Sequence, residues 1–396
     1  MWMGRKKNIK WHEFDSQRVN VPYYPLRSYT DGKFKYEIGS GVAKIKFVEF
    51  FTSMARTAVL TNPIWYEEKF EVISFWLRFS RHFASGNEVR LRPGSVSYYK
   101  DADRTYWASR LGETFGYIEM QRRGFSIIDH MENAIKRIDP GNNVKGGSDY
   151  YCVNDKFNAL AEFKGHIVKP NINDYTDIKD QLAKALDQCD KFLKKVPKLG
   201  KVSTFAVATY IREVGDSSDE PSLVAISDPV NNGELSDTNS NITPESLLES
   251  ALRGNYGTWV QMMGLHDLGI DILDSSQSEL NFPLYLMTIT YGGNKYVFIE
   301  DEHHWDHCFY PKLNINFLYG LQEDIFRDIV LATLTNQPLT TLPSIVNIMK
   351  RKSNEIQFDL DQDSEVHIFN DGAIAISPIK FRKYHFSFEL WEPSSK

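Results

Sequence analysis

The sequence has 396 residues, 42% hydrophobic and 25% charged, with a formal net charge of -6. These proportions are those of a globular protein, and the acidic balance excludes nucleic-acid binding through bulk positive charge, so any such site would need a local basic patch. The three widely spaced cysteines, Cys152, Cys189 and Cys308, predict no disulfide framework and a reducing, cytoplasmic location. No apolar run of about 18 residues occurs, and the basic start lacks an apolar stretch, so we expect neither a membrane span nor a signal peptide.

The first part of the chain, residues 1–98, is predicted to be an α+β segment. Two strands are expected over 33–39 and 42–51, and apolar residues at helical spacing predict a helix over 67–84. The glycines within 39–44 are a weak signal for a phosphate-binding loop, because the third glycine and the following Gly-Lys-Ser/Thr are missing.

Residues 99–230 are predicted to form a different unit, with the order helix, three strands, helix, two strands. The first helix covers 105–123 and ends at Gly124. Strands are expected over 125–129, 149–153 and 159–166, and the last two form a hairpin around the turn at 154–157. A long amphipathic helix over 174–196 and apolar strands over 203–211 and 222–228 complete this unit.

A polar, turn-rich linker is expected over 228–241, followed by a C-terminal α+β domain, residues 243–396, of unknown role. Helices are predicted over 243–265, where a threonine and a proline mark the start, and over 316–335. Hairpins are predicted over 282–301, around two glycines, and over 366–377, around an Asn-Asp-Gly turn.

The hairpin over 149–166 carries charged residues at an unusual spacing. Side chains two apart in a strand share a face, so Glu162 and Lys164 project together. A four-residue turn would place Asp149 opposite Glu162, whereas a one-residue slip would put Asp149 on the other face. A shared site therefore requires a register in which the two residue numbers of each cross-strand pair, such as 149 and 162, add to an odd total.

Two adjacent carboxylates repel each other, and a hard divalent cation removes that penalty. Mg²⁺ prefers oxygen ligands and retains several waters, so two carboxylates and the Phe163 carbonyl would be sufficient ligands. The cation lowers the pKa of a bound water and neutralises charge on a phosphate, and a neighbouring lysine can position the water. These residues are a chemically complete set for hydrolysing a phosphodiester bond.

Asp149 followed by Glu162-Phe163-Lys164, within this order of helices and strands, resembles the PD-(D/E)XK nuclease superfamily over roughly residues 105–228. The resemblance implies an α/β fold whose central αβββαβ restriction-endonuclease-like core has a mixed sheet and α+β flanks. It implies that Asp149 and Glu162 bind Mg²⁺ or Mn²⁺ and that Lys164 serves the attacking water. It also implies a further acid, Glu113, from the preceding helix, and in some branches Lys184 and Gln188 from the following one. Ser148 replaces the family's proline, and Asp155 is a competing aspartate that falls in the expected turn.

The resemblance thus predicts a metal-dependent nuclease with DNA as the favoured substrate, and by family analogy a role in restriction or anti-phage defence, as a homo-oligomer or a subunit of a defence complex. One alternative is an ordinary hairpin with a solvated Glu162–Lys164 pair. Another is a non-enzymatic scaffold or interaction protein with the same fold. A third is a zinc site formed by His303, His304, His307 and Cys308, for which a histidine-rich loop is the simpler interpretation. The stretch 359–365 is rejected as a calcium loop because it lacks the required glycine and glutamate.

Overall fold

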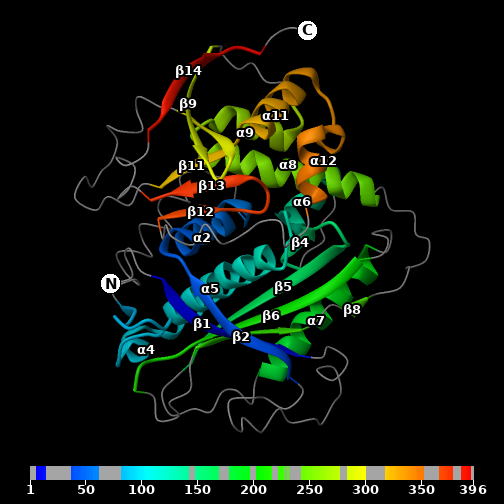
Figure 1. Ribbon diagram of the computed structural model, residues 1–396. Helices are drawn as coiled ribbons and strands as arrows, with labels where there is room; N and C mark the ends of the chain where they lie inside the picture. Colours follow the sequence, from blue (N-terminus) through cyan, green and yellow to red (C-terminus); the bar gives the residue numbers. More distant parts are fainter. Residues whose placement is uncertain are drawn as a thin grey trace.

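The computed structural model describes residues 6–14, 37–61, 82–141, 148–168, 178–196, 202–215, 222–227, 230–231, 242–276, 283–299, 317–351, 365–377 and 385–393. Figure 1 shows two β-sheets with helices between and around them, which is an α/β architecture. Among the described residues, no helix is long and apolar enough to cross a membrane.

The first sheet is mixed, and within the described residues it has eight strands in the order β2-β1-β7-β6-β5-β4-β3, with β8 paired to β6. The β5–β6 and β1–β7 pairs are parallel, and the other neighbours are antiparallel. The strands are β1 (Lys7–Phe14), β2 (Glu37–Ile45), β3 (Ile127–His130), β4 (Tyr150–Val153), β5 (Asn158–Ile167), β6 (Val202–Ile211), β7 (Leu223–Ser227) and β8 (Val230–Asn231).

Helices pack on both faces of this sheet and also lie between it and the second sheet. Among the described residues, the first six in chain order are α2 (Phe47–Thr61), α4 (Ser95–Tyr98), α5 (Asp101–Arg122), α6 (Met131–Ile138), α7 (Ile178–Lys195) and α8 (Pro244–Met262). The order α5, β3, β4, β5, α7, β6 follows the prediction from the sequence, and α6 is an additional short helix between β3 and β4. A capping box between Thr243 and Ser246 starts α8 where the sequence predicts it.

The N-terminal residues differ from the prediction. The expected strand over 42–51 is wrong beyond Ile45, because α2 starts at Phe47 and buries Phe47, Phe50 and Phe51. Their aromatic side chains pack on a helix face as well as they would on a strand. The partner of β2 is β1, which the sequence analysis did not identify. Of the helix expected over 67–84, residues 67–81 lie outside the described part of the chain.

Strand β1 joins the predicted N-terminal segment to the predicted core. It pairs in parallel with β7, for example Lys10 with Leu223. One cluster of buried side chains also includes Phe50, Phe115 and Trp259, which come from the three segments 1–98, 99–230 and 243–396. The three segments therefore share one hydrophobic core.

Helix α5 lies unusually close to β5 because small residues line the contact. A methyl group added to Gly165 would come within 1.8 Å of the Ala108 carbonyl oxygen, and one added to Gly112 would meet the Gly165 nitrogen at 2.6 Å. Gly116 makes room in the same way for the Phe163 ring. Helix α7 covers the opposite face, where its buried apolar residues pack on small side chains of β6.

The second sheet is antiparallel and, in the described residues, has six strands in the order β12-β13-β11-β10-β9-β14. Both predicted hairpins are confirmed. The helix expected over 316–335 is wrong in its first part, because 318–322 form a strand and the helix begins at Glu323. The elements are α9 (His266–Asp274), β9 (Leu284–Tyr291), β10 (Asn294–Ile299), β11 (Leu318–Gln322), α11 (Glu323–Thr335), η4 (Leu339–Thr341), α12 (Pro343–Met349), β12 (Val366–Ile368), β13 (Ala373–Ile376) and β14 (Ser387–Trp391).

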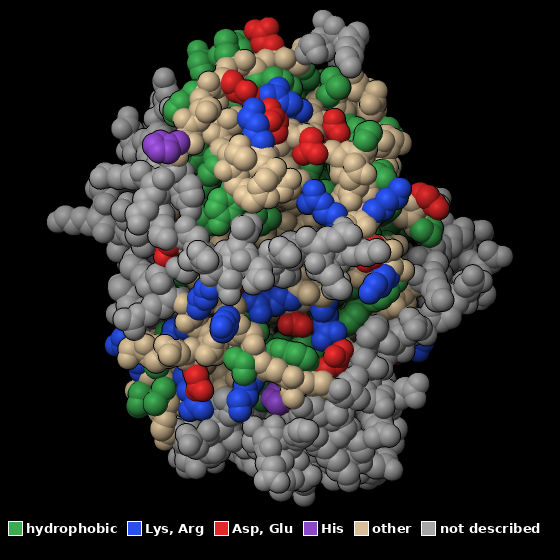
Figure 2. Space-filling model, viewed as in Figure 1, with side chains coloured by type: hydrophobic (Ala, Val, Ile, Leu, Met, Phe, Trp, Pro, Cys, Tyr) green, Lys and Arg blue, Asp and Glu red, His purple; other side chains and the backbone are tan. Residues whose placement is uncertain are grey.

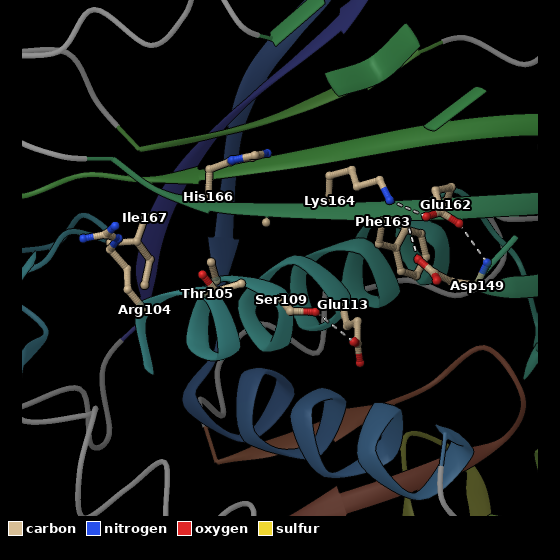
Figure 3. A pocket seen from close by; sticks show the side chains of 12 residues that line it. Arg104, Thr105, Ser109, Glu113, Asp149, Glu162, Phe163, Lys164, His166 and Ile167 are labelled. Atoms are coloured by element: carbon tan, nitrogen blue, oxygen red, sulfur yellow. Dashed lines mark hydrogen bonds and ion pairs between the residues drawn. The ribbon is translucent and has the colours of Figure 1, made fainter. Parts of the chain in front are cut away.

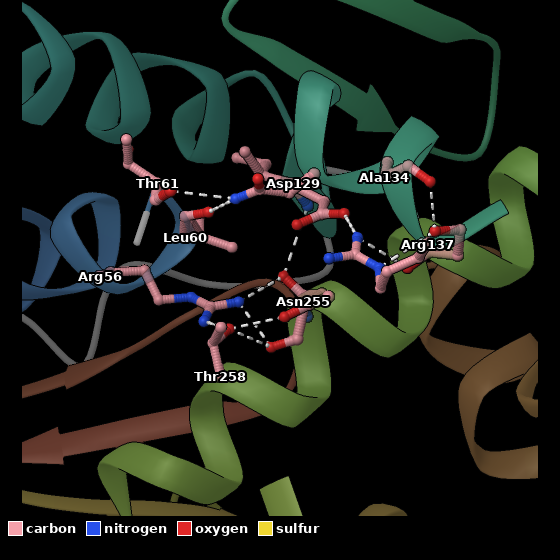
Figure 4. A network of polar contacts seen from close by, with 12 residues as sticks. Arg56, Leu60, Thr61, Asp129, Ala134, Arg137, Asn255 and Thr258 are labelled. Atoms are coloured by element: carbon pink, nitrogen blue, oxygen red, sulfur yellow. Dashed lines mark hydrogen bonds and ion pairs between the residues drawn. The ribbon is translucent and has the colours of Figure 1, made fainter. Parts of the chain in front are cut away.

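A buried polar network links the two sheets through α2 and α8. The Arg56 guanidinium is fully buried and donates to the main-chain carbonyl of Asn255 at 2.6 Å and to its side-chain oxygen at 2.9 Å (Figure 4). The Asn255 amide donates in turn to Asp371, in the turn before β13, at 3.1 Å. The Trp259 indole donates to the same Asp371 oxygen at 2.6 Å and lies under Arg56. This network fixes the position of the second sheet against the helices of the first.

Candidate metal centre at the open edge of β5

The candidate site lies where β5 extends beyond its neighbour. Strand β6 pairs with β5 from Asn158 to Ile167, but β4 pairs only with Asn158 to Ala161. From Glu162 onward, that edge of β5 has no partner strand among the described residues. A pocket of about 380 Å³ lies between this edge and the first half of α5 (Figure 3). Its lining residues are Arg104, Thr105, Ala108, Ser109, Glu113, Asp149, Glu162, Phe163, Lys164, Gly165, His166 and Ile167.

The register of the hairpin brings the two predicted carboxylates together. Tyr150 pairs with Ala161, which is the register that the hypothesis requires. The Asp149 N–H donates to Glu162 Oε2 at 3.0 Å, and the Phe163 N–H donates to Asp149 Oδ2 at 2.9 Å. Because the N–H and C=O of one residue leave a strand on the same side, the Phe163 carbonyl also faces the open edge.

Burial and mutual repulsion make the second negative charge of this pair costly. Desolvation and the Glu162 carboxylate raise the pKa of Asp149 to about 8, against the hydrogen bond from the Phe163 N–H, which lowers it. Burial also raises the pKa of Glu162, although Lys164 acts in the opposite direction. The metal-free pair therefore retains a proton at neutral pH more readily than isolated carboxylates do.

Lys164 lies beside the carboxylate pair, as predicted. Its Nζ is 2.5 Å from Glu162 Oε1, and its side chain is 26% exposed whereas that of Glu162 is 2% exposed. Figure 3 shows Glu162, Lys164 and His166 projecting from one side of β5, while Phe163 and Ile167 point toward α5. The ammonium group is thus held at the site and remains accessible from the pocket.

Glu113 lines the same pocket but does not join the pair. Its carboxylate accepts from Arg110 Nη1 at 2.5 Å and from the Ser109 hydroxyl at 3.4 Å. Within the part of the chain that the structure describes, no three side chains of His, Cys, Asp or Glu lie together so that they could hold a metal ion. The expected convergence of three carboxylates is therefore reduced to two in this conformation.

The two candidates on α7 lie elsewhere. Lys184 is exposed, Gln188 is partly buried, and neither lines the pocket. The α7 residue that approaches the site is Cys189, whose Sγ is 3.6 Å from the Ser148 hydroxyl. Cys189 is buried on the same face of α7 as Leu182, Ala185 and Leu186, beside the carboxylate pair, and burial raises its pKa.

The residues at the far end of the pocket, Arg104 and His166 in particular, were not predicted from the sequence. His166 follows the same two-residue alternation as Glu162 and Lys164, so this signal was present in the sequence. Arg104 is nine residues before Glu113, about two and a half helical turns, and its place became apparent only from the packing of α5 on β5.

The donor set suits a hard divalent cation. All nearby ligands are oxygens, from two carboxylates and one main-chain carbonyl, and Mg²⁺ commonly binds one or two carboxylates and keeps its remaining waters. The raised pKa values add a physical reason, because a cation would replace the proton that the pair otherwise retains.

Comparison with protein-family models, with curated proteins and with solved structures finds no match to this chain. The residues predicted as a zinc site, His303 to Cys308, lie outside the described residues, as does nearly all of the stretch 359–365.

Proposed function

We propose that this protein is a metal-dependent nuclease of the PD-(D/E)XK type that hydrolyses phosphodiester bonds, with DNA as the favoured substrate. The observation that carries the proposal is the grouping of Asp149, Glu162 and Lys164 at the open edge of β5. Main-chain hydrogen bonds hold the two acids side by side, Lys164 Nζ is 2.5 Å from Glu162, and all three line one pocket. A hairpin with a merely solvated charge pair would not bury Glu162 to 2% exposure.

The chain's own residues have distinct tasks in this proposal. Asp149, Glu162 and the Phe163 carbonyl would hold Mg²⁺ or Mn²⁺, which when bound supplies charge neutralisation at the phosphate and a lowered pKa for water. Lys164 donates to the attacking water and orients its lone pair toward phosphorus. The water oxygen forms the new bond to phosphorus and loses a proton to solvent, while the bond to the leaving sugar oxygen breaks and that oxygen takes up a proton from solvent.

The arrangement of the elements supports the same proposal. The order α5, β3, β4, β5, α7, β6, with parallel β5 and β6, corresponds to the αβββαβ core expected from the resemblance, with α6 added. Figure 2 shows a hollow over α5 and β5 in which Lys and Arg side chains lie around Asp and Glu side chains. Such a local patch is what an acidic protein needs to attract a polyanion.

One observation favours the alternative of a non-catalytic scaffold. Glu113 pairs with Arg110 and does not join Asp149 and Glu162. A protein that had lost its activity would tolerate that arrangement. The two proposals differ in one measurable property, since only the nuclease requires Lys164.

The test is cleavage of plasmid, linear duplex DNA, single-stranded DNA and RNA with Mg²⁺ or Mn²⁺, with and without EDTA. We expect metal-dependent cleavage by the wild type and a loss of about 100-fold or more in Lys164→Ala. The matched control is Lys156→Ala, which removes an exposed lysine in the turn of the same hairpin and should leave cleavage unchanged.

Cleavage that survives in Lys164→Ala would refute this site. Absence of cleavage in every substrate, from protein shown to bind Mn²⁺, would favour the scaffold.

A further inference from the structure

The pocket beside β5 continues well beyond the carboxylate pair. One end contains Asp149, Glu162 and Lys164, and the other contains Arg104 and His166. In Figure 3 these two groups lie at opposite ends of the pocket, with His166 further along β5 and Arg104 on α5. Catalysis as proposed uses only the acidic end, so the basic end has no assigned role.

The length of the pocket suits a short stretch of polymer. Glu162 and His166 are four residues apart in an extended strand, which corresponds to roughly 13 Å. Stacked nucleotides rise about 3.4 Å each. A nucleic-acid strand with one phosphate at Lys164 therefore extends at least one further phosphate past His166.

Arg104 has donors available for such a phosphate. Its one described ion pair, at 2.5 Å, is with Asp101, whose side chain is 85% exposed, so the pair is weak and solvent-screened. That contact uses one terminal nitrogen, and a guanidinium has five N–H donors in a planar fork that fits phosphate oxygens. The Arg104 side chain itself is only 19% exposed, so its position along α5 is defined by packing.

His166 is held in place at the same end of the pocket. Its ring stacks on the Tyr210 ring, with centroids 5.0 Å apart and an angle of 17° between the planes. An imidazole fixed in this way can donate to a phosphate oxygen with little loss of side-chain entropy.

We propose that Arg104 and His166 form a second phosphate subsite, which binds the backbone of a single-stranded nucleic acid next to the bond that is cut. The nucleic-acid strand lies along the open edge of β5. Its scissile phosphate is at Lys164, and a neighbouring phosphate is between Arg104 and His166. This inference rests on the proposed nuclease function, and it specifies the substrate of that site.

The size of the pocket selects single strands. Pockets for small ligands span roughly 300–1,000 Å³, and this one, at about 380 Å³, is near the lower limit. It admits one or two nucleotides but not both strands of a helix. The reacting nucleotide must therefore be unpaired when it enters.

The test measures binding separately from cleavage. Fluorescence anisotropy would follow labelled oligonucleotides of about 12 nucleotides, oligo-dT and oligo-U, and a duplex of the same length, with Ca²⁺ as the carboxylate-binding cation. A denaturing gel afterwards checks that each probe is intact. The variants are Arg104→Gln and His166→Gln, which keep a polar side chain but remove the guanidinium or the imidazole, and the control is Lys191→Gln on the solvent side of α7, 64% exposed.

We expect Arg104→Gln to weaken single-strand binding by about tenfold, and to reduce the slope of log K against log salt by about 0.7, the value for one lost phosphate contact. His166→Gln should weaken binding by a smaller factor, and Lys191→Gln should leave it unchanged. Circular dichroism checks that each variant is folded. A preference for oligo-dT or for oligo-U distinguishes DNA from RNA.

Binding by both variants within twofold of the wild type would overturn the subsite, as would tighter binding of the duplex than of either single strand. If the wild type cleaves and the variants bind normally, the nuclease stands and the subsite fails. If the variants lose affinity but the wild type never cleaves, the subsite stands and the nuclease fails.

Discussion

The main-chain N–H of Asp149 donates a 3.0 Å hydrogen bond to the carboxylate of Glu162, thirteen residues further along the chain. In return, the N–H of Phe163, the residue after Glu162, donates to the Asp149 carboxylate. Each acid is therefore held by the backbone next to the other. This reciprocal arrangement keeps the two acids side by side in spite of the repulsion between their charged forms, and in the proposed function it is the place where a cation would bind.

Metal affinity should depend on the pair and only slightly on Glu113. We expect Asp149→Asn and Glu162→Gln each to weaken Mn²⁺ binding by at least about 100-fold, because each removes a charged ligand. Glu113→Gln should change affinity by less than about threefold, since that carboxylate is bound to Arg110. Isothermal titration calorimetry and the electron paramagnetic resonance spectrum of Mn²⁺ would measure this. A loss in Glu113→Gln equal to that in Glu162→Gln would mean that Glu113 rotates into the site.

The stability of the metal-free protein should fall as pH rises. The folded-state pKa of Asp149, about 8, is above the unfolded value of about 3.9, so between these values the folded state binds the extra proton. The stabilisation that this proton provides is complete below pH 4 and is lost as pH rises through 8. In EDTA, we expect the thermal midpoint of the wild type to fall between pH 6 and 9 more steeply than that of Asp149→Asn. Parallel curves would show that Asp149 is ionised throughout, and Mg²⁺ should reduce the difference by replacing the proton.

The close contact of α5 with β5 predicts a strong steric effect. Gly165→Ala should lower the free energy of unfolding by about 3 kcal/mol or more, because the new methyl group would overlap the Ala108 carbonyl, which is backbone and cannot rotate away. The matched control is Gly86→Ala, where a methyl group meets nothing within 4 Å. Urea denaturation of the two variants gives the comparison. Equal stabilities would contradict the contact.

The network around Arg56 should be equally sensitive to loss of its bridging amide. Asn255→Ala removes an acceptor from the buried Arg56 guanidinium and a donor from Asp371, so we expect a loss of about 3 kcal/mol or more. Gln337→Ala removes an amide side chain from the surface and should cost little. A change of less than about 1 kcal/mol in Asn255→Ala would show that water replaces the amide.

The local parts of the site could be predicted from the sequence, because strand alternation and turn length determine which residues share a face. These two facts placed Asp149, Glu162 and Lys164 correctly in one group. The position of Glu113 could not be predicted, because it depends on a competing partner, Arg110, three residues earlier on the same helix. The amphipathic pattern of α7 identifies its buried face, but the two residues that the resemblance implied, Lys184 and Gln188, lie outside that face and away from the pocket.

The errors in the fold have a similar origin. Residues 47–51 and 318–322 are apolar or aromatic runs too short for their periodicity to distinguish helix from strand. Strand β1 pairs with β7, and pairing over such a distance leaves no local trace in the sequence. The small residues Ala108, Gly112 and Gly116, spaced by four, did carry a signal, since this pattern lets a helix approach a sheet closely.

The parallel pairing of β1 with β7 also affects the order in which the sheet can assemble on the ribosome. Lys10 is synthesised early, but its partner Leu223 follows 213 residues later. At roughly 5–20 residues per second, that delay is about 10 to 40 seconds. During this interval one edge of β1 presents unsatisfied main-chain groups, protected on the other side by β2. We therefore expect the nascent chain to benefit from chaperones that cover this edge, and recombinant yield should rise when they are supplied in excess.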